Sequence, residues 1–229
     1  MDTTKERYDF NDFVEIVSEL RSEHGCPWDK AQTHESIEKD LIEESYEFIN
    51  EVDEKNYEGM CEELGDVMLN ILLHSQMASE EKKFDIGDVI DGISKKMIYR
   101  HPHVFETDKV SNVEEALDSF EARKAKEKNI GGLEDKLKRI PNSYPMLLKS
   151  YKLSSVLSKN LEGWNNKVNE EIVKSGIEKL TSANNTDEAE KVIGDMLFEI
   201  CKLSKQLNIN PELALEKKYL KVYKEALKS

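Results

Sequence analysis

Apolar side chains recur every three or four residues along most of the chain, a spacing that gathers them on one face of an α-helix. Thr33, Asn56 and Asp85 each precede such a stretch and are suitable N-caps. The helices that they begin are expected to run to about residue 53, residue 80 and the His101-Pro102 step, because the residue before a proline avoids helical geometry. An earlier stripe, ending near His24-Gly25, comprises Phe10, Phe13, Val14, Ile16, Val17 and Leu20. Four helices with short connections predict an antiparallel bundle.

The connection between the first two of these helices has the composition of a loop. Gly25 and Pro27 punctuate residues 25–29, and the same stretch contains Trp28, one of only two tryptophans in the chain. A tryptophan in a loop is more often a packing anchor than a ligand contact. Both interpretations of Trp28 stay open at this point.

A change of pattern near residue 130 predicts a domain boundary. Residues 114–128 predict a highly charged helix in which Phe120 is the one aromatic side chain. Gly131-Gly132 then interrupts the chain, and a second apolar-periodic region follows. We therefore expect a first domain over residues 1–130 and a second over residues 131–229.

The helices expected after Thr33 and after Asn56 carry paired carboxylates. Glu44 and Glu47 lie one turn apart, as do Glu63 and Asp66, so each pair projects from one face of its helix. Glu43 flanks the first pair. The apolar residues between these carboxylates, which we expect to form core, are Leu41, Ile42, Tyr46, Phe48, Ile49, Leu64, Val67, Met68, Ile71 and Leu72.

Carboxylates held beside a core need a neutralising charge, and the surrounding sequence does not offer one. No lysine or arginine occurs between Lys39 and Lys55 or between Lys55 and Lys82. A divalent cation is the obvious neutraliser. Ligands that are all oxygen suit a hard ion such as Mg²⁺, with Mn²⁺ also possible.

Two cations share one face of the helix expected after Asp85. Lys96 and Arg100 are four residues apart. They are either solvated cations near a helix C-terminus, where the helix dipole favours them, or clamps for phosphate oxygens beside a metal site. The pattern leaves both interpretations open.

Composition excludes several classes of function. The net charge is −14, and it is concentrated in residues 1–130, which hold 16 basic and 33 acidic side chains; residues 131–229 hold 17 and 14. Residues 1–130 therefore lack the excess of basic side chains with which a protein binds the phosphates of a nucleic acid. No apolar run reaches the length of a membrane span, and the start of the chain is not signal-like. Three widely spaced cysteines predict reduced thiols in a cytoplasmic protein.

The sequence of the second half resembles a degenerate repeat of the first half. Residues 170–174 parallel residues 43–47, and residues 192–197 parallel residues 63–68. In this alignment Lys174 replaces Glu47 and Val192 replaces Glu63, whereas Glu171 and Asp195 remain. Because two of four ligand positions are lost, we expect no metal there and a structural or dimerising role.

Glu-Glu-x-x-Glu, fifteen intervening residues and Glu-x-x-Asp together resemble the signature of the MazG family of nucleoside triphosphate pyrophosphohydrolases. The resemblance covers nearly the whole chain, including the degenerate second repeat. Its other motifs are Gly25-Cys26-Pro27-Trp28-Asp29-Lys30 with Gln32-Thr33, Glu63-Leu64-Gly65-Asp66, and Arg100-His101-Pro102-His103-Val104-Phe105.

The resemblance implies an all-α enzyme whose active site lies in a four-helix bundle completed by homodimerisation. It implies Mg²⁺-dependent hydrolysis of (d)NTPs to (d)NMP and pyrophosphate, by attack of water on the α-phosphorus. The metal ligands would be Glu44, Glu47, Glu63 and Asp66, with Glu43 as an accessory acid that orients or deprotonates the water. Lys96 and Arg100 would hold the phosphates, and Trp28 is a further candidate for substrate contact. Phe120 occupies a position where relatives carry a tryptophan against the base.

The favoured hypothesis is an enzyme of broad specificity that clears unwanted nucleotides, and there are three alternative functions. A di-iron or di-manganese bundle requires Glu-x-x-His pairs, and none of the five histidines follows a glutamate at that spacing. A non-catalytic acidic module would bind a basic partner without metal. A narrower pyrophosphatase would accept one base, as relatives specific for dUTP or dCTP do.

Overall fold

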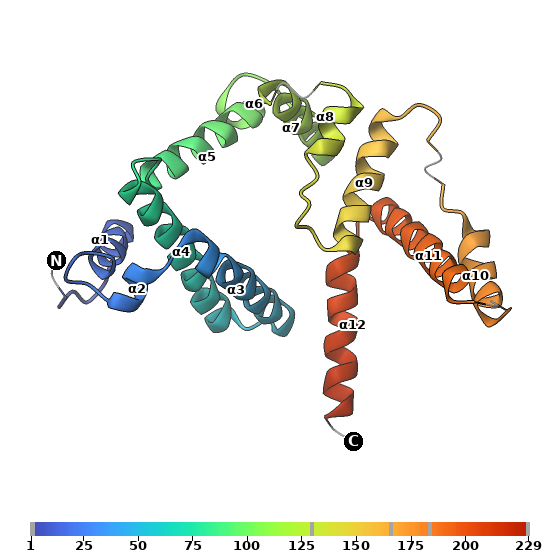
Figure 1. The fold of residues 1–229 in the computed structure, drawn as a ribbon. Helices are drawn as coiled ribbons and strands as arrows, with labels where there is room; N and C mark the ends of the chain where they lie inside the picture. The colour runs from blue at the N-terminus through green and yellow to red at the C-terminus, as the bar shows by residue number, and fades with distance from the viewer. Residues whose placement is uncertain (1–2, 129–130, 165–166, 183–184, 228–229) are drawn as a thin grey trace. The chain divides into compact units, whose positions relative to one another are not determined.

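A computed structural model describes residues 3–128, 131–164, 167–182 and 185–227, and over these ranges the secondary structure is helical with no strand. The all-α prediction is therefore confirmed (Figure 1). The chain divides into two compact units, Met1–Glu121 and Ala122–Ser229. Each unit is described by itself. None of the helices in the described ranges is long and apolar enough to cross a membrane.

The helices of the first unit follow the predicted order. They are α1 (Phe10–Leu20), α2 (Pro27–Ala31), α3 (His34–Glu54), α4 (Tyr57–Glu80), α5 (Ile86–Arg100), α6 (Pro102–Phe105) and α7 (Val113–Glu127). The division between the units falls inside α7. The second unit contains α8 (Leu133–Lys138), α9 (Met146–Asn160), α10 (Glu170–Ser182), α11 (Thr186–Gln206) and α12 (Pro211–Ala226).

The three predicted N-caps are confirmed. Thr33 Oγ1 accepts a hydrogen bond from Ser36 N, and Ser36 Oγ accepts one from Thr33 N, which completes a capping box. Asn56 and Asp85 cap α4 and α5 through their side-chain oxygens. The prediction of a loop over residues 25–29 is wrong in part, because Pro27 begins the short helix α2 at its first position, where proline needs no N–H donor.

A small core holds α1, α3 and α4 together. Val17 of α1, Ile37 of α3 and Leu72, Leu73 and Met77 of α4 are buried against one another. These residues lie where α3 begins and α4 ends. The prediction that the apolar residues beside the carboxylates form core is wrong for five of them. The exposed ones, with exposures of 40–57%, are Ile42, Tyr46, Leu64, Met68 and Ile71.

The α5 helix does not complete a bundle with α3 and α4 in the single chain. Figure 1 shows α5 leading away from the α3–α4 pair rather than running along it. Its apolar stripe is left uncovered, with Val89, Ile90 and Ile93 all exposed. The bundle expected from four consecutive helices is therefore not closed by one copy, and apolar residues of α3, α4 and α5 are all left exposed.

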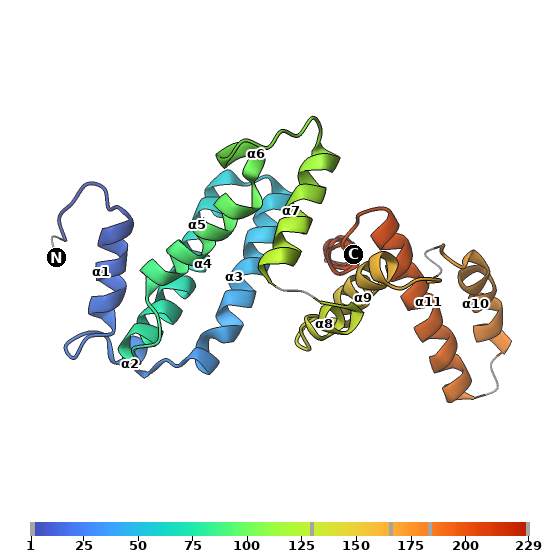
Figure 2. The ribbon, with the colours of Figure 1, turned by 90° about the horizontal axis from the view of Figure 1, so that it is seen from above.

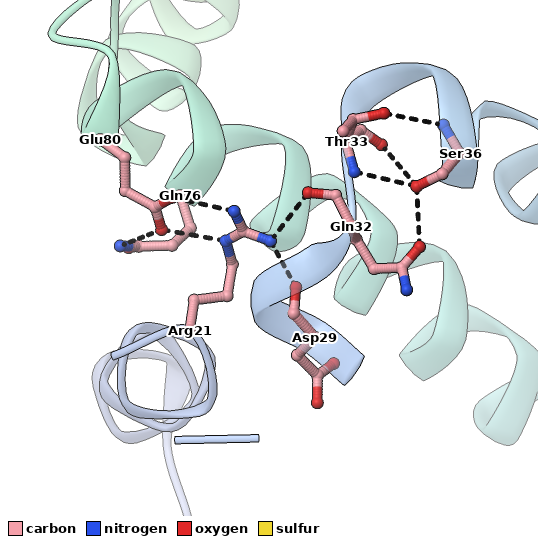
Figure 3. Close-up of polar contacts among 7 residues, drawn as sticks. All are labelled: Arg21, Asp29, Gln32, Thr33, Ser36, Gln76 and Glu80. Carbon is pink, nitrogen blue, oxygen red and sulfur yellow. Dashed lines mark hydrogen bonds and ion pairs between the residues drawn. The ribbon is translucent and has the colours of Figure 1, made fainter. Parts of the chain in front are cut away.

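A buried arginine that the sequence did not single out fixes the short helix α2. Arg21 donates from Nε and Nη2 to the two carboxylate oxygens of Glu80, each at 2.9 Å. Its Nη1 donates to the carbonyl oxygens of Asp29 and Gln32 at 2.5 and 3.2 Å. Figure 3 shows this guanidinium between α4 and the end of α2. The hydrogen bonds from Arg21 hold the pKa of Glu80 below its usual value.

We expect Arg21→Met to lower the free energy of unfolding by about 2–3 kcal/mol, because it removes four hydrogen bonds that join Glu80 to the carbonyl oxygens of Asp29 and Gln32 through one buried guanidinium. Urea unfolding monitored by circular dichroism measures this loss. Lys95→Met is the control, since it removes an exposed ion pair with Asp91 and should cost less than about 0.5 kcal/mol. Equal losses in the two variants would contradict the role of Arg21.

The second unit is built from a helix pair of the same kind. The α10 and α11 helices lie side by side in both views (Figure 1, Figure 2). They approach closely at Gly176, where a Cβ would lie 2.3 Å from the Met196 Sδ. The α9 helix packs on α11, as α1 packs on α4 in the first unit. This order agrees with a repeated unit, although the repeat itself stays a prediction.

Candidate metal and nucleotide site

Three of the predicted ligands meet between α3 and α4. One carboxylate oxygen each from Glu44, Glu63 and Asp66 can be chosen so that all three lie within 4.8 Å of one another. All three residues are half-buried. Within the described part of the chain this is the one group of three or more acidic, histidine or cysteine side chains so close together.

The turn between α3 and α4 sets the register that brings these carboxylates together. Lys55 adopts a left-handed conformation with φ of 57°, which ends α3. Glu51 accepts hydrogen bonds from the Asn56 and Asn50 side-chain amides at 2.6 and 3.0 Å. Gly59 allows the close approach, because a Cβ there would lie 2.3 Å from Glu51 Oε2. From this turn, helical spacing places Glu63 and Asp66 on one face of α4.

Loss of hydration and mutual repulsion both disfavour the charged forms of the clustered glutamates. Loss of hydration raises the pKa of Glu44 most, followed by repulsion from Asp66, Glu47 and Glu63. Loss of hydration likewise raises the pKa of Glu63, followed by repulsion from Glu47 and Asp66. Glu47 therefore acts on both neighbours, although its own side chain is exposed and lies outside the close group. A hard divalent cation fits this set of oxygen donors.

Removing one carboxylate should stabilise the protein when no metal is bound. A raised pKa means that the folded state holds the proton more tightly than the unfolded state, so these glutamates cost stability above their folded pKa. We expect Glu44→Gln to raise the melting temperature in EDTA at pH 7. The gain should vanish as the pH falls below the ordinary glutamate value of 4.5, where the wild-type carboxyls are protonated in both states.

Differential scanning fluorimetry across this pH range measures the effect. Glu43→Gln is the control, because Glu43 is exposed and the change should leave the melting temperature nearly constant. A lower melting temperature for Glu44→Gln in EDTA at pH 7 would contradict the repulsion within the cluster.

The candidate phosphate and base contacts form a second group at the end of α5. Arg100 is buried, and its Cζ lies 5.5 Å from the centre of the Phe120 ring. His101 also packs against Phe120, with ring centres 5.2 Å apart, and its Nδ1 lies 2.7 Å from the Met97 carbonyl oxygen. The structure thus joins Arg100 to Phe120, whereas Lys96 is exposed on the preceding turn.

The remaining candidates are exposed or distant from the cluster. Trp28 is 63% exposed on α2, so the interpretation as a packing anchor is wrong within one copy of the chain. Glu43 points its side chain to solvent on α3. Lys96 and Arg100 belong to α5, and this helix leads away from the α3–α4 pair that carries the acidic cluster (Figure 1).

Asn70 is a polar residue near the cluster that the sequence analysis missed. It is buried one turn after Asp66, and its Nδ2 donates to the Asp66 carbonyl oxygen at 3.1 Å. Its side-chain amide therefore lies on the same side of α4 as the acidic residues. The available signal was a polar residue four positions after Asp66 in an otherwise apolar stretch.

The corresponding positions of the second unit are arranged differently. Glu171 and Asp195 are both exposed. Lys174, at the position aligned with Glu47, forms an ion pair with Glu170 at 2.6 Å. A cation thus stands where the first unit has a carboxylate.

Comparison with protein-family models identifies the class of domain to which the first part of the chain belongs. Residues 32–105 match the family model of the MazG nucleotide pyrophosphohydrolase domain. This segment contains the whole acidic cluster together with Lys96 and Arg100. Phe120 lies beyond it.

Relatives extend the match to most of the chain. The nucleoside triphosphate pyrophosphohydrolase/pyrophosphatase MazG of Thermotoga maritima is 39% identical over 214 residues, which are 91% of this chain and 80% of that protein. The nucleoside triphosphate pyrophosphohydrolase of Escherichia coli is 33% identical over 209 residues, 88% of this chain and 80% of that protein. YabN of Bacillus subtilis, an uncharacterized protein, is 46% identical over 146 residues, which are 64% of this chain and only 30% of YabN. The chain belongs to the MazG family.

Proposed function

We propose that this protein hydrolyses nucleoside triphosphates to the monophosphate and pyrophosphate, with Mg²⁺ as its cofactor and Mn²⁺ as a possible substitute. The observation that carries the proposal is the group formed by Glu44, Glu63 and Asp66 inside the matched segment. The relatives from Thermotoga and Escherichia, which match over most of this chain, are named for the same reaction.

Each acidic side chain has a role in this proposal. Glu44, Glu63 and Asp66 would hold the ion, and Glu47 would add charge from the next turn of α3. A bound Mg²⁺ supplies a Lewis acid that activates water and offsets the charge of pyrophosphate. Glu43 would accept a proton from the water as its oxygen bonds to the α-phosphorus. The bond from that phosphorus to the bridging oxygen breaks, and pyrophosphate leaves.

We propose that the working site is shared between two copies of the chain. The acidic cluster lies beside exposed apolar residues of α3 and α4, and the apolar stripe of α5 is also uncovered. A homodimer that packs these faces together would close the bundle. It would also bring Lys96 and Arg100 of a second copy to the phosphates bound at the cluster, where they would stabilise the developing negative charge.

We propose a broad range of (d)NTP substrates, which suits clearance of unwanted nucleotides from the cytoplasm. Phe120 presents a smaller ring than tryptophan, and one neighbour of that ring is the Arg100 guanidinium. A base that stacked on the Phe120 ring or under the Arg100 guanidinium would be recognised as an aromatic ring, and not by the hydrogen-bonding edge of one particular base. Free thiols at Cys26, Cys61 and Cys201 support a reducing compartment.

Pyrophosphate release from the eight standard (d)NTPs, with Mg²⁺ and with EDTA, tests the proposal. We expect release from most of them in Mg²⁺ and none in EDTA. Activity on one base alone would replace the broad enzyme by a narrow one. Inactivity on these and on non-standard nucleotides would favour an acidic helical module that binds a basic partner.

A further inference from the structure

The second unit contains a cavity whose chemistry differs from that of the acidic first unit. It has a volume of about 250 Å³ and lies between α9, the end of α11 and the residues that follow α9. Its lining includes Trp164, Ser154 and three lysines, Lys159, Lys202 and Lys205, and no carboxylate of the described residues contributes to it. The cavity lies in residues 131–229, which hold 17 basic and 14 acidic side chains, so its surroundings do not repel an anion as the acidic first unit would.

The wall of the cavity at Lys202 is held by hydrogen bonds and an ion pair. Lys202 is buried, and its Nζ lies 3.0 Å from both carboxylate oxygens of Glu199 and 3.1 Å from the Lys167 carbonyl oxygen. The same Nζ lies 5.9 Å from the centre of the Trp164 ring. Because Glu199 balances the charge of Lys202, this pair orients the tryptophan without attracting an anion itself.

Two further cations are left to act on a ligand. Lys205 lies over the Tyr151 ring at 5.8 Å, and neither Lys205 nor Lys159 forms an ion pair with any described residue. Ser154 is only 3% exposed and its Oγ is closed to solvent, so this residue shapes the wall of the cavity and offers no polar contact to a ligand. The polar contacts of a ligand would therefore come from Lys159 and Lys205.

We propose that this cavity binds a small phosphate monoester that carries an aromatic ring, as nucleoside monophosphates do. The aromatic part would lie against Trp164 inside the cavity, and the phosphate would contact Lys159 and Lys205 at its edge. The volume suits a single ring system and is too small for a large cofactor. This site is separate from the acidic cluster of the first unit, and the inference stands whether or not that cluster is catalytic.

Tryptophan fluorescence gives a direct test, because the chain has only two tryptophans. In full-length protein with Trp28→Phe, all tryptophan emission comes from Trp164. AMP is titrated in EDTA, so that metal-dependent binding at the first unit does not contribute. We expect a saturable change in emission with AMP, and a weaker response to adenosine or to inorganic phosphate alone, since each lacks half of the contacts.

Variants separate binding in the cavity from binding elsewhere. Lys205→Met and Lys159→Met, each in the Trp28→Phe background, should weaken AMP binding by about tenfold, the effect of losing one polar contact. Lys174→Met is the matched control, because it removes an exposed lysine of the same unit outside the cavity. Melting temperatures show that each variant is folded.

Three results would overturn the proposal. The first is no saturable response to AMP up to about 10 mM, which is weaker than specific ligand binding. The second is equal affinity in wild-type, Lys205→Met and Lys174→Met backgrounds. The third is a response to phosphate alone as strong as that to AMP, which would mean an anion site without aromatic recognition.

Discussion

Glu44→Gln is expected to lower the rate of pyrophosphate release by about 10²–10³-fold, the usual effect of removing a charged group that stabilises the transition state. Glu44 is the one member of the three-carboxylate group that lies on α3, so its substitution leaves only the two carboxylates of α4. The assay is pyrophosphate release under saturating Mg²⁺ and substrate. Because the substitution relieves repulsion, the inactive variant should remain folded.

Asp195→Asn is the matched control for this result. Asp195 aligns with Asp66 in the second unit but is exposed. We expect its substitution to leave the rate within about twofold of wild type, as for a surface change away from the site. Equal loss in both variants would mean that the second unit also takes part in catalysis.

If the site is shared between two copies as proposed, Ile93→Lys is expected to abolish both dimerisation and activity. Ile93 lies on the apolar stripe of α5 and is 49% exposed in the single chain, so the isolated fold should tolerate the change within about 0.5 kcal/mol. A charge buried in an apolar interface, by contrast, costs several kcal/mol. Light scattering after gel filtration measures the mass, and pyrophosphate release measures the activity.

Ser94→Lys is the control, since it adds the same charge at an exposed neighbouring position on a different face of α5. It should leave the dimer and the rate unchanged. A monomeric, fully active Ile93→Lys protein would contradict the shared site.

Mixing two inactive variants tests the shared site from another direction. Chains with Glu44→Gln and chains with Lys96→Met are unfolded and refolded together. If one copy supplies the acids and the other the lysine, half of the dimers are mixed and each has one intact site, so about a quarter of the wild-type activity returns. If both residues act within one chain, the mixture stays inactive.

Local features of the chain could be predicted from the sequence, whereas contacts between distant residues could not. Thr33, Asn56 and Asp85 were identifiable because an N-cap acts on amides only two or three residues away. The meeting of Glu63 and Asp66 followed from helical spacing alone. Arg21 was missed because its partner Glu80 lies 59 residues away, and no local pattern marks that pair.

Helical periodicity could not show which apolar faces the chain itself covers. Leu72 and Leu64 belong to similar stretches of α4, yet Leu72 is buried in the core with α1 and Leu64 is half exposed. The difference depends on where α1 packs and where α5 leads, which is a property of the tertiary structure. The uncovered residues are the main physical support for a second copy.

Hydrolysis of a nucleoside triphosphate in ¹⁸O-labelled water tests the central claim most directly. Mass spectrometry of the products shows which phosphorus accepted the water oxygen. Attack on the α-phosphorus predicts labelled monophosphate and unlabelled pyrophosphate, produced only when Mg²⁺ is present. Label in pyrophosphate, or release of inorganic phosphate with the diphosphate, would contradict the proposed reaction.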